Sequence, residues 1–413
     1  MEKKIFLAAF LILHVAGLWA VENATIEIRG RVVDKADNSP LSFCNILVDG
    51  SYASTVANSE GEFLVKLPEN AMDIVLTFSH IGYKSRKIKA GDLLNGRGVV
   101  SLDVASFQLP QIDVLTQDAE AIVRGMFEKA EQNYPAKEML LTAFYRESIK
   151  KNKSYVSLSE AVVDVRKFAY NNKRDDVARL YKSRKQADYE KLDTLVFKLM
   201  GGPYNNLLMD VMKRPDIIFS DDIFKKYIFS IDKIDWMDDK LIYVINFTHQ
   251  EYTEEALYQG KLYIDAVTLA LRSAVFNLSL KNQEEAVSMF IRKKPFNAKV
   301  TLTDAKYRVN YFEKDGKWYY AYSRIELGMK INWKKKLFNT NYFAIVEMAV
   351  TDRDDNIVSK DVEWKDRLRE NVIIADKALG FSDPDFWGVN NIIEPEKPIE
   401  AAIRKIQKQL EKR

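Results

Sequence analysis

Apolar and polar residues alternate along the first hundred residues of the chain. Residues 26–33 are rich in β-branched side chains, and residues 74–78 place Ile, Leu and Phe at every second position. A period of two is typical of half-buried strands. Residues 34–40 and 57–61 are dense in Asp, Asn, Ser, Gly and Pro, which form turns. Short strands at this spacing predict a seven-stranded type of β-sandwich over residues 25–114.

Several short motifs follow one another along this segment. They are Gly30-Arg31-Val32-Val33-Asp34, Pro40-Leu41, Asn58-Ser59-Glu60-Gly61-Glu62-Phe63 and Phe78-Ser79-His80-Ile81-Gly82-Tyr83. The pattern resembles the carboxypeptidase-like regulatory domain, a transthyretin-like sandwich found at the N-termini of many envelope proteins of Bacteroidetes, including outer-membrane receptors. The resemblance implies an accessory or docking module and no active site. Cys44 departs from the pattern, and we expect it to be buried like a small apolar residue.

The next segment predicts a linker helix over residues 117–134. Its apolar residues fall at helical spacing, and Pro135 closes it. Residues 138–380 then read as long strands joined by short turns, with one helical insertion at 203–212. Asp315-Gly316 is the strongest hairpin signal in the chain. The pattern predicts an antiparallel meander that must curl or be covered to bury its apolar face.

One strand pair in the meander suggests its shape. Residues 260–265, followed by 268–271, are similar to the strand pairs of lipoprotein-carrier folds, which are open half-barrels that cup an acyl chain. The resemblance implies a larger curved antiparallel sheet. Residues 381–413 are predicted to end in an amphipathic helix from about Pro398, docked on its own domain or, alternatively, on a membrane or a partner helix.

Residues 1–20 have the features of a secretory signal peptide. Two lysines precede an apolar run, and a small residue, Ala20, precedes polar sequence. We expect cleavage near Ala20 and a location in the periplasm or at the outer membrane; the alternative is an uncleaved anchor helix. The absence of Cys near Ala20 argues against a lipidated N-terminus. No later stretch is apolar and long enough to predict a transmembrane span.

Net charge and cysteine content argue against two classes of protein, those that bind nucleic acid and those stabilised by disulfides. Loss of the leader lowers the formal net charge from +3 to +2, which gives no overall electrostatic footprint for nucleic acid. A single cysteine excludes an internal disulfide framework.

The residues needed for common catalytic sites are scarce. Beyond the leader the chain has only two histidines, His80 and His249, and neither begins an HExxH motif. A peptidase-type zinc site needs about three such ligands, so we expect no metal site. No GxSxG motif occurs, and the SxxK matches at Ser148 and Ser230 lie on predicted strands, whereas that chemistry requires a helix.

The clusters of acidic and aromatic residues are explained by turns and core packing without a catalytic or metal-binding role. The spacing of Asp352, Asp354, Asn356 and Glu363 matches a calcium loop, but Ile357 occupies the position that requires glycine. Paired carboxylates such as 221–222 and 238–239 read as solvated turns. The aromatic residues concentrated at 311–333 are expected to pack in the core, with a ligand-lining role as the alternative.

The sequence thus predicts a mostly β, non-enzymatic, exported envelope protein without catalytic residues, metal or cofactor. Its partners are predicted to be other envelope proteins or an apolar or lipid ligand, with no nucleic acid. A carrier for a lipid or another apolar envelope molecule is the alternative function, and it predicts a continuous apolar cavity on the concave side of the sheet. An enzyme of unrecognised type is the other alternative.

Overall fold

A computed structural model describes most of the chain beyond the leader. The described residues are 25–95, 98–105, 118–152, 154–187, 198–199, 201–237, 240–250, 255–293, 296–334, 339–355, 367–377, 379–380, 387–388, 390–396, 399 and 401. The predicted signal peptide and nearly all of the predicted C-terminal helix lie outside these residues. Among the described residues, no helix is long and apolar enough to cross a membrane.

The N-terminal segment forms the predicted seven-stranded sandwich. One sheet has the order β4-β1-β7 and the other the order β3-β2-β5-β6. Their bounds are β1 Thr25–Asp34, β2 Asn45–Val48, β3 Ser54–Val56, β4 Glu62–Pro68, β5 Val75–Ser79, β6 Arg86–Lys89 and β7 Val99–Leu102. Inward side chains such as Ile28, Phe63 and Phe78 form a separate core. Cys44 is fully buried in this core, as predicted.

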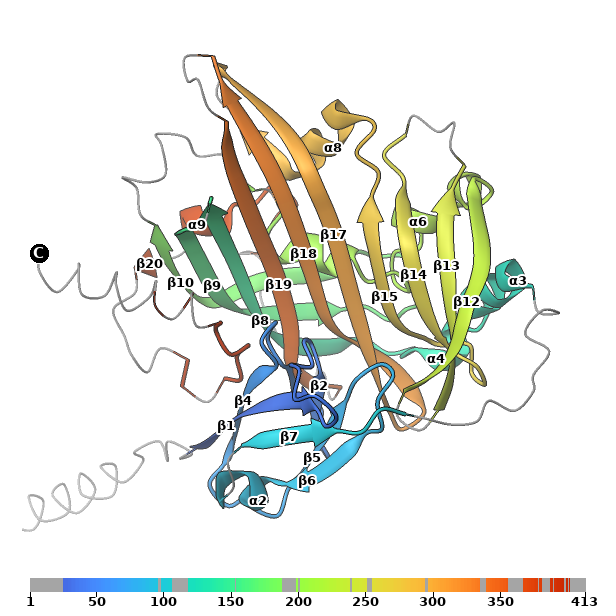
Figure 1. Cartoon of the computed structure of the whole chain (residues 1–413), viewed down its shortest axis with the longest axis vertical. Helices are drawn as coiled ribbons and strands as arrows, with labels where there is room; N and C mark the ends of the chain where they lie inside the picture. The colour runs from blue at the N-terminus through green and yellow to red at the C-terminus, as the bar shows by residue number, and fades with distance from the viewer. Residues whose placement is uncertain are drawn as a thin grey trace, which may run out of the picture.

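A second, larger sheet follows, and it is antiparallel except at one edge (Figure 1). Its order is β12-β13-β14-β15-β17-β18-β19-β8-β9-β10-β20, in which only the short β20 runs parallel to its neighbour. The bounds are β8 Met139–Lys151, β9 Ser154–Lys167, β10 Val177–Ala187, β12 Tyr227–Met237, β13 Lys240–His249, β14 Tyr258–Asp265, β15 Leu271–Leu278, β17 Ala298–Lys314, β18 Lys317–Trp333, β19 Thr340–Asp354 and β20 Leu379–Gly380. The linear order leaves the sheet open, which confirms the predicted curved, unclosed meander.

Turn chemistry explains the central hairpin of this sheet. Asp315 and Gly316 connect β17 to β18 with φ angles of 51° and 74°. Two successive positive φ angles are typical of the type I′ turn that matches the twist of paired strands.

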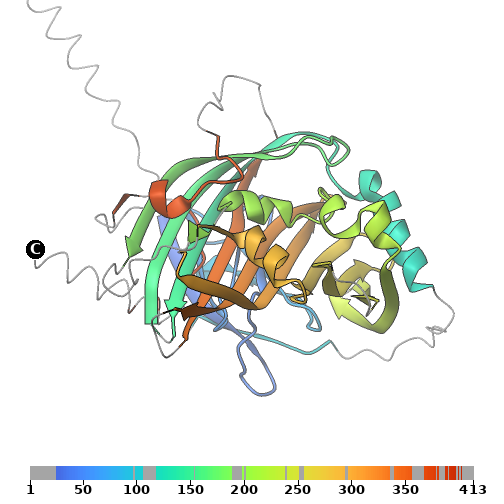
Figure 2. The ribbon, with the colours of Figure 1, turned by 90° about the horizontal axis from the view of Figure 1, so that it is seen from above.

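Short helices cover the concave face of the large sheet, as the view from above shows (Figure 2). They are α3 Ala119–Glu128, α4 Ala130–Asn133, α5 Pro203–Leu208, α6 Asp216–Phe219, α7 Asp221–Phe224, α8 Gln283–Phe290 and α9 Ile374–Lys377. The predicted linker helix is therefore divided at Lys129 into α3 and α4, and the insertion at 203–212 is helical only as far as Leu208. The helices and the concave face share the largest hydrophobic core of the molecule, so side chains fill most of this face.

The sandwich and residues 387–396 cover part of the convex face. Ser54 donates a hydrogen bond to the carbonyl oxygen of Val350 at 2.8 Å, and Thr55 donates one to that of Ile392 at 3.2 Å. Phe43 stacks on Tyr322 with ring centroids 6.1 Å apart. A mixed core joins Val56 and Leu64 of the sandwich to the sheet and to Trp387. The two domains are therefore packed directly on each other.

Gly260 allows β14 and β15 to approach closely, which generates a prediction for stability. An added Cβ would lie 2.2 Å from the carbonyl oxygen of Val275 and 2.5 Å from the Cα of Phe276. We expect Gly260→Ala to lower the free energy of unfolding by ~1–3 kcal/mol in chemical denaturation, because backbone must move.

Gly125→Ala is the matched control. Its added Cβ would approach only the flexible end of Leu269, and alanine favours helix α3. A loss for Gly125→Ala as large as that for Gly260→Ala would contradict the explanation.

Candidate functional site

A cleft with a volume of about 860 Å³ lies between the linker helices and α6 and α7. The turn between β9 and β10 closes one side of it. Its lining residues are Arg124, Phe127, Glu128, Ala130, Glu131, Tyr170, Asn171, Asn172, Lys173, Asp175, Met212, Lys213, Arg214, Pro215, Asp216, Phe219, Asp221 and Phe224. Apolar and charged side chains therefore contribute to the same cleft.

Aromatic rings form the floor of the cleft. The rings of Phe127 and Phe219 have centroids 5.7 Å apart, and Phe219 also contacts Phe224 at 6.2 Å. The guanidinium of Arg124 lies 4.3 Å from the centroid of the Phe224 ring. A cation over a ring face adds to the apolar contact area. The floor can thus contact an apolar group and still present a positive charge at its edge.

Charged residues form the rim. Arg214 pairs with Asp216 at 2.8 Å and also with Asp175. Hydrogen bonding to Asp216 is the largest cause that raises the pKa of Arg214. Lys213 donates hydrogen bonds to the carbonyl oxygens of Ala169, at 2.8 Å, and Asn172. Burial lowers the pKa of Lys213 from its ordinary value.

A buried ion cluster lies directly beneath the cleft. The Nζ atom of Lys167 lies 2.8 Å from an oxygen of Asp176 and 2.6 Å from an oxygen of Asp210. The hydroxyls of Tyr170 and Tyr311 donate to the two oxygens of Asp210 at 2.8 and 2.7 Å. Burial opposes the charge of Lys167, but the two aspartates outweigh it, and the pKa of Lys167 is raised.

This cluster joins distant parts of the chain. Lys167 ends β9, Asp210 follows α5, and Tyr311 lies on β17. Lys167 and Asp210 have side chains that are 3% and 0% exposed, so neither can reach a ligand in the cleft without rearrangement. These bonds occupy both carboxylate oxygens of Asp210. We therefore interpret the cluster as the support for one wall of the cleft.

Glu147 is a second buried acid on the concave face. It is 5% exposed, and its described partner is the hydroxyl of Tyr145 at 3.2 Å. Ile325, Leu327 and Phe290 line a cavity of about 10 Å³ next to it, which is room for about one water molecule. Burial raises the pKa of Glu147 to about 7, although the bond from Tyr145 opposes the shift.

Charged residues on the convex face bind the covering segments. Arg146 lies 2.7 Å from Glu160, which also pairs with Arg184 at 2.8 Å. Arg146 donates a further bond to the carbonyl oxygen of Ile393 at 2.9 Å. The ion pairs lie within β8, β9 and β10, and the bond from Arg146 to Ile393 connects the C-terminal segment to the sheet.

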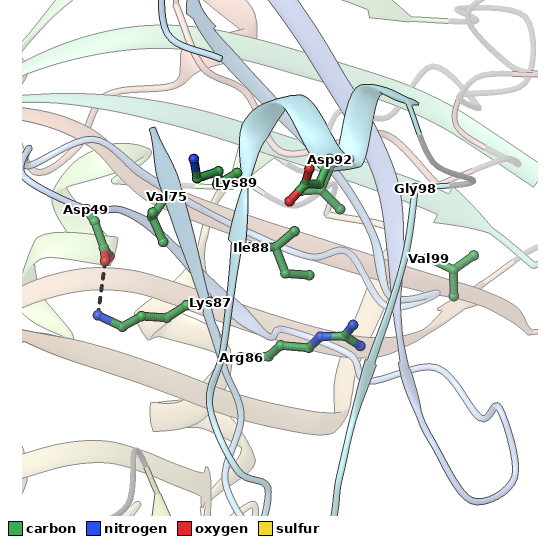
Figure 3. A pocket seen from close by; sticks show the side chains of 10 residues that line it. Asp49, Val75, Arg86, Lys87, Ile88, Lys89, Asp92, Gly98 and Val99 are labelled. Atoms are coloured by element: carbon green, nitrogen blue, oxygen red, sulfur yellow. Dashed lines mark hydrogen bonds and ion pairs between the residues drawn. The ribbon is translucent and has the colours of Figure 1, made fainter. Parts of the chain in front are cut away.

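A further cavity of about 710 Å³ opens on the sandwich beside β6 and β7 (Figure 3). Lys87 pairs with Asp49 at 3.0 Å at one side of this cavity. Both side chains of this pair are partly solvated, at 67% and 30% exposure, so the pair contributes little to stability.

The histidines considered in the sequence have separate environments. The ring nitrogens of His80 lie 3.0 Å from the carbonyl oxygen of Ile81 and 3.2 Å from that of Ser42, within the sandwich. Burial lowers the pKa of His80. His249 ends β13 in the other domain. Among the described residues, no group of three or more His, Cys, Asp or Glu side chains could hold a metal ion.

The other candidate motifs are not brought together. Ser148 lies on β8 and Ser230 on β12, both in strands as predicted. Asp352 and Asp354 lie on β19, whereas Asn356 and Glu363 fall outside the described residues. The predicted aromatic cluster is largely core, since Tyr311, Trp318 and Tyr320 are each at most 2% exposed.

Sequence reasoning missed the cluster at Lys167 and the buried acid Glu147. Each is a charged residue at an inward position of a strand that otherwise places apolar residues there. That break in the alternation is the signal that could have found them.

Comparison with known proteins identifies the N-terminal domain. Residues 28–107 match the CarboxypepD_reg-like domain family. The resemblance of the N-terminal motifs to the carboxypeptidase-like regulatory domain is thereby confirmed. No curated protein matches the chain.

Solved structures similar to this chain show low identity. A DUF1329 family protein from Desulfovibrio piger is 13% identical, with a TM-score of 0.25, over 60% of this chain and 98% of that chain. A LolA superfamily protein from Nitrosomonas europaea is 13% identical, with a TM-score of 0.23, over 60% and 99%. Lipovitellin is 7% identical, with a TM-score of 0.26, over 61% and 28%. Similarity at this level establishes no ligand or activity for this chain.

The cluster beneath the cleft generates a second stability prediction. We expect Lys167→Met to lower the free energy of unfolding by ~3–5 kcal/mol, because Asp176 and Asp210 then share a dry site without a cation. Lys173→Met, at the exposed rim of the same cleft, is the control and should change it by less than about 0.5 kcal/mol. Equal effects in urea titrations would show that the cluster does not support the fold.

Glu147 predicts a pH dependence. Its raised pKa means that the folded state keeps a proton that the unfolded state releases, so its contribution to stability falls as pH rises from about 4.5 through about 7. Glu147→Gln should therefore be nearly as stable as the wild type at pH 4.5 and more stable by ~3 kcal/mol at pH 8.

The control for this measurement is Glu69→Gln, which changes an exposed carboxylate of the sandwich. Its difference from the wild type should not vary with pH in the same way. A pH-independent difference for Glu147→Gln would refute the assignment.

Proposed function

We propose that this protein is a non-enzymatic binding protein of the cell envelope that holds an amphiphilic ligand in the cleft at α3, α6 and α7. In this proposal the chain is exported after cleavage near Ala20 and acts in the periplasm or at the outer membrane. The observation that carries the proposal is the cleft of about 860 Å³, with aromatic rings at its floor and charges at its rim.

The shape and chemistry of the cleft favour an amphiphile. Its volume lies in the range of about 300–1,000 Å³ that is typical of small-molecule sites. The rings of Phe127, Phe219 and Phe224 can receive an apolar chain. The rim carries charges of both signs, among them Lys173 and Glu131, and can solvate a polar head.

The location of the cleft modifies the carrier alternative. A carrier was expected to have a continuous apolar cavity along the concave face. Most of that face is filled by the core shared with the helices. The proposed ligand therefore lies between the helices, beside Phe127 and Phe219, and does not extend along the concave face of the sheet.

The charged residues around the cleft support binding more than catalysis. Asp210 is held by Lys167, Tyr170 and Tyr311. Lys213 is held by two backbone carbonyls. Side chains with these bonds stabilise the walls of the cleft. A catalytic base, in contrast, must lie within hydrogen-bond distance of the proton that it removes from the substrate.

The sandwich has an accessory role in this proposal. It packs on the convex face through Ser54, Thr55 and Phe43, away from the concave side that the helices cover. We propose that it stiffens the sheet and presents its outer surface to other envelope proteins.

Filling the cleft tests the proposal. Ala130 lines the cleft and is half-buried, so Ala130→Trp should occupy space needed by a ligand. Binding of a fluorescent palmitic acid analogue, measured by fluorescence titration, should weaken by at least about tenfold, which corresponds to ~1.4 kcal/mol.

Ala136→Trp is the matched control, because Ala136 is exposed and does not line the cleft. It should bind the analogue like the wild type. Failure of the wild-type protein to bind, or equal binding by the Ala130→Trp variant, would overturn the proposed function.

A further inference from the structure

Several strand ends lie side by side at the end of the large sheet farthest from the sandwich (Figure 1). They are the end of β8, the starts of β9, β17 and β19, and the end of β18, and they flank the connections from β8 to β9, from β16 (Ile291–Lys293) to β17, and from β18 to β19. Ala298 pairs with Trp333, and Tyr342 pairs with Lys151, so the strand ends lie side by side. Backbone bonds from Lys334 to Asn297, at 3.0 Å, and from Asn152 to Asn341, at 2.8 Å, fix the arrangement.

The sequence around these connections is strongly basic. Residues 148–158, 291–303 and 327–346 together contain eleven Lys or Arg and no Asp or Glu. The whole chain has 62 basic and 59 acidic residues, so its near-neutral total hides this local excess. Among the described residues of these segments, Lys299, Lys330 and Lys334 lie at strand ends that the fold places together at one end of the molecule.

The described side chains present this charge to solvent. Lys299 and Lys330 alternate with buried strand residues and are exposed, and Lys334 is exposed just beyond β18. Among the ion pairs between described residues, none involves these three lysines. They are therefore not neutralised by neighbouring carboxylates in the described part of the chain.

An aromatic side chain accompanies the lysines. Phe296, which precedes β17, is 95% exposed, the highest value among the exposed large apolar residues. A fully exposed Phe has no role in the core. Beside basic residues it can enter the boundary between the headgroups and acyl chains of a bilayer.

We propose that this basic end, defined by Lys299, Lys330, Lys334 and Phe296, docks the protein on an anionic lipid surface. Each lysine near such a surface adds electrostatic attraction that salt weakens. The strand ends that carry these residues lie at one end of the same sheet, so the residues can meet a flat surface together. The exposed phenyl ring favours a bilayer over nucleic acid, since it supplies insertion as well as charge.

Docking at this end is independent of the cleft. The cleft is lined by residues of α3, α6, α7 and the β9–β10 turn, none of which belongs to the three basic segments. The orientation would leave the sandwich directed away from the lipid surface. Loss of docking would therefore leave binding in the cleft unchanged, and the two proposals can fail separately.

Vesicle flotation tests the docking. The full chain without its leader should float with vesicles of phosphatidylcholine and phosphatidylglycerol, and not with vesicles of phosphatidylcholine alone. The variant Lys299→Glu, Lys330→Glu, Lys334→Glu should lose at least ~10-fold in partition to the anionic vesicles. Phe296→Ser should lose a smaller part, and high salt should release the wild type.

The matched control reverses three exposed lysines of the sandwich, Lys35→Glu, Lys87→Glu and Lys89→Glu, whose side chains are 61%, 67% and 58% exposed. It carries the same net charge as the test variant and should still float. Equal loss in both variants, unchanged flotation of the test variant, or wild-type flotation with neutral vesicles would overturn the proposal. Stronger binding to double-stranded DNA than to anionic vesicles would assign the basic end to nucleic acid instead. Circular dichroism confirms that each variant is folded.

Discussion

Both faces of the large sheet must be covered, and the rest of the architecture follows from that constraint. The concave face is mostly apolar, with Glu147 and Lys167 as buried exceptions, and the helices that follow β10 and β15 pack on it. The convex face contains buried charges such as Arg146 and Glu160, which are tolerable only with partners. The carbonyl oxygen of Ile393 is one of these partners. The cover of the concave face is therefore mainly hydrophobic, whereas the cover of the convex face combines a smaller hydrophobic core with specific polar contacts.

The way in which short helices cover the concave face explains how the cleft arises. Helices as short as α6 and α7 cannot fill the space between the linker helices and the β9–β10 turn, so the cleft opens there. The cluster at Lys167 holds the same region to β17 through Tyr311. A rigid wall made from distant strands can keep a cleft open, whereas a loop alone would collapse into it.

Local patterns in the sequence were sufficient for most of the fold. The alternation of apolar and polar residues predicted the long strands, and Asp315-Gly316 predicted the central hairpin. The glycine and aromatic motifs predicted the sandwich. The helices α6 to α8 were missed because each has only four to eight residues, too few for a clear helical period. The break of the linker helix at Lys129 was missed for the same reason.

The site could not be assembled from the sequence, because its parts are far apart in the chain. Lys167 and Asp210 are separated by 43 positions, and Asp210 and Tyr311 by 101. Only the pairing of strands brings them together. The basic end could not be predicted from the sequence for the same reason. Its lysines occur in three separate segments, and only the register of β8, β17, β18 and β19 shows that the strand ends of these segments lie side by side.

The contact between the sandwich and residues 387–396 has a consequence for the order of assembly. Asn58 donates to the carbonyl oxygen of Glu394 at 3.3 Å, and the backbone N–H of Lys66 donates to Asn391, so the sandwich is completed by residues that follow it by more than 300 positions in the chain. The sandwich can form its own core early, but its final docked position has to wait until residues 391–394 have been synthesised. Premature termination anywhere before residue 387 would thus leave the newborn chain with an exposed seam between its domains.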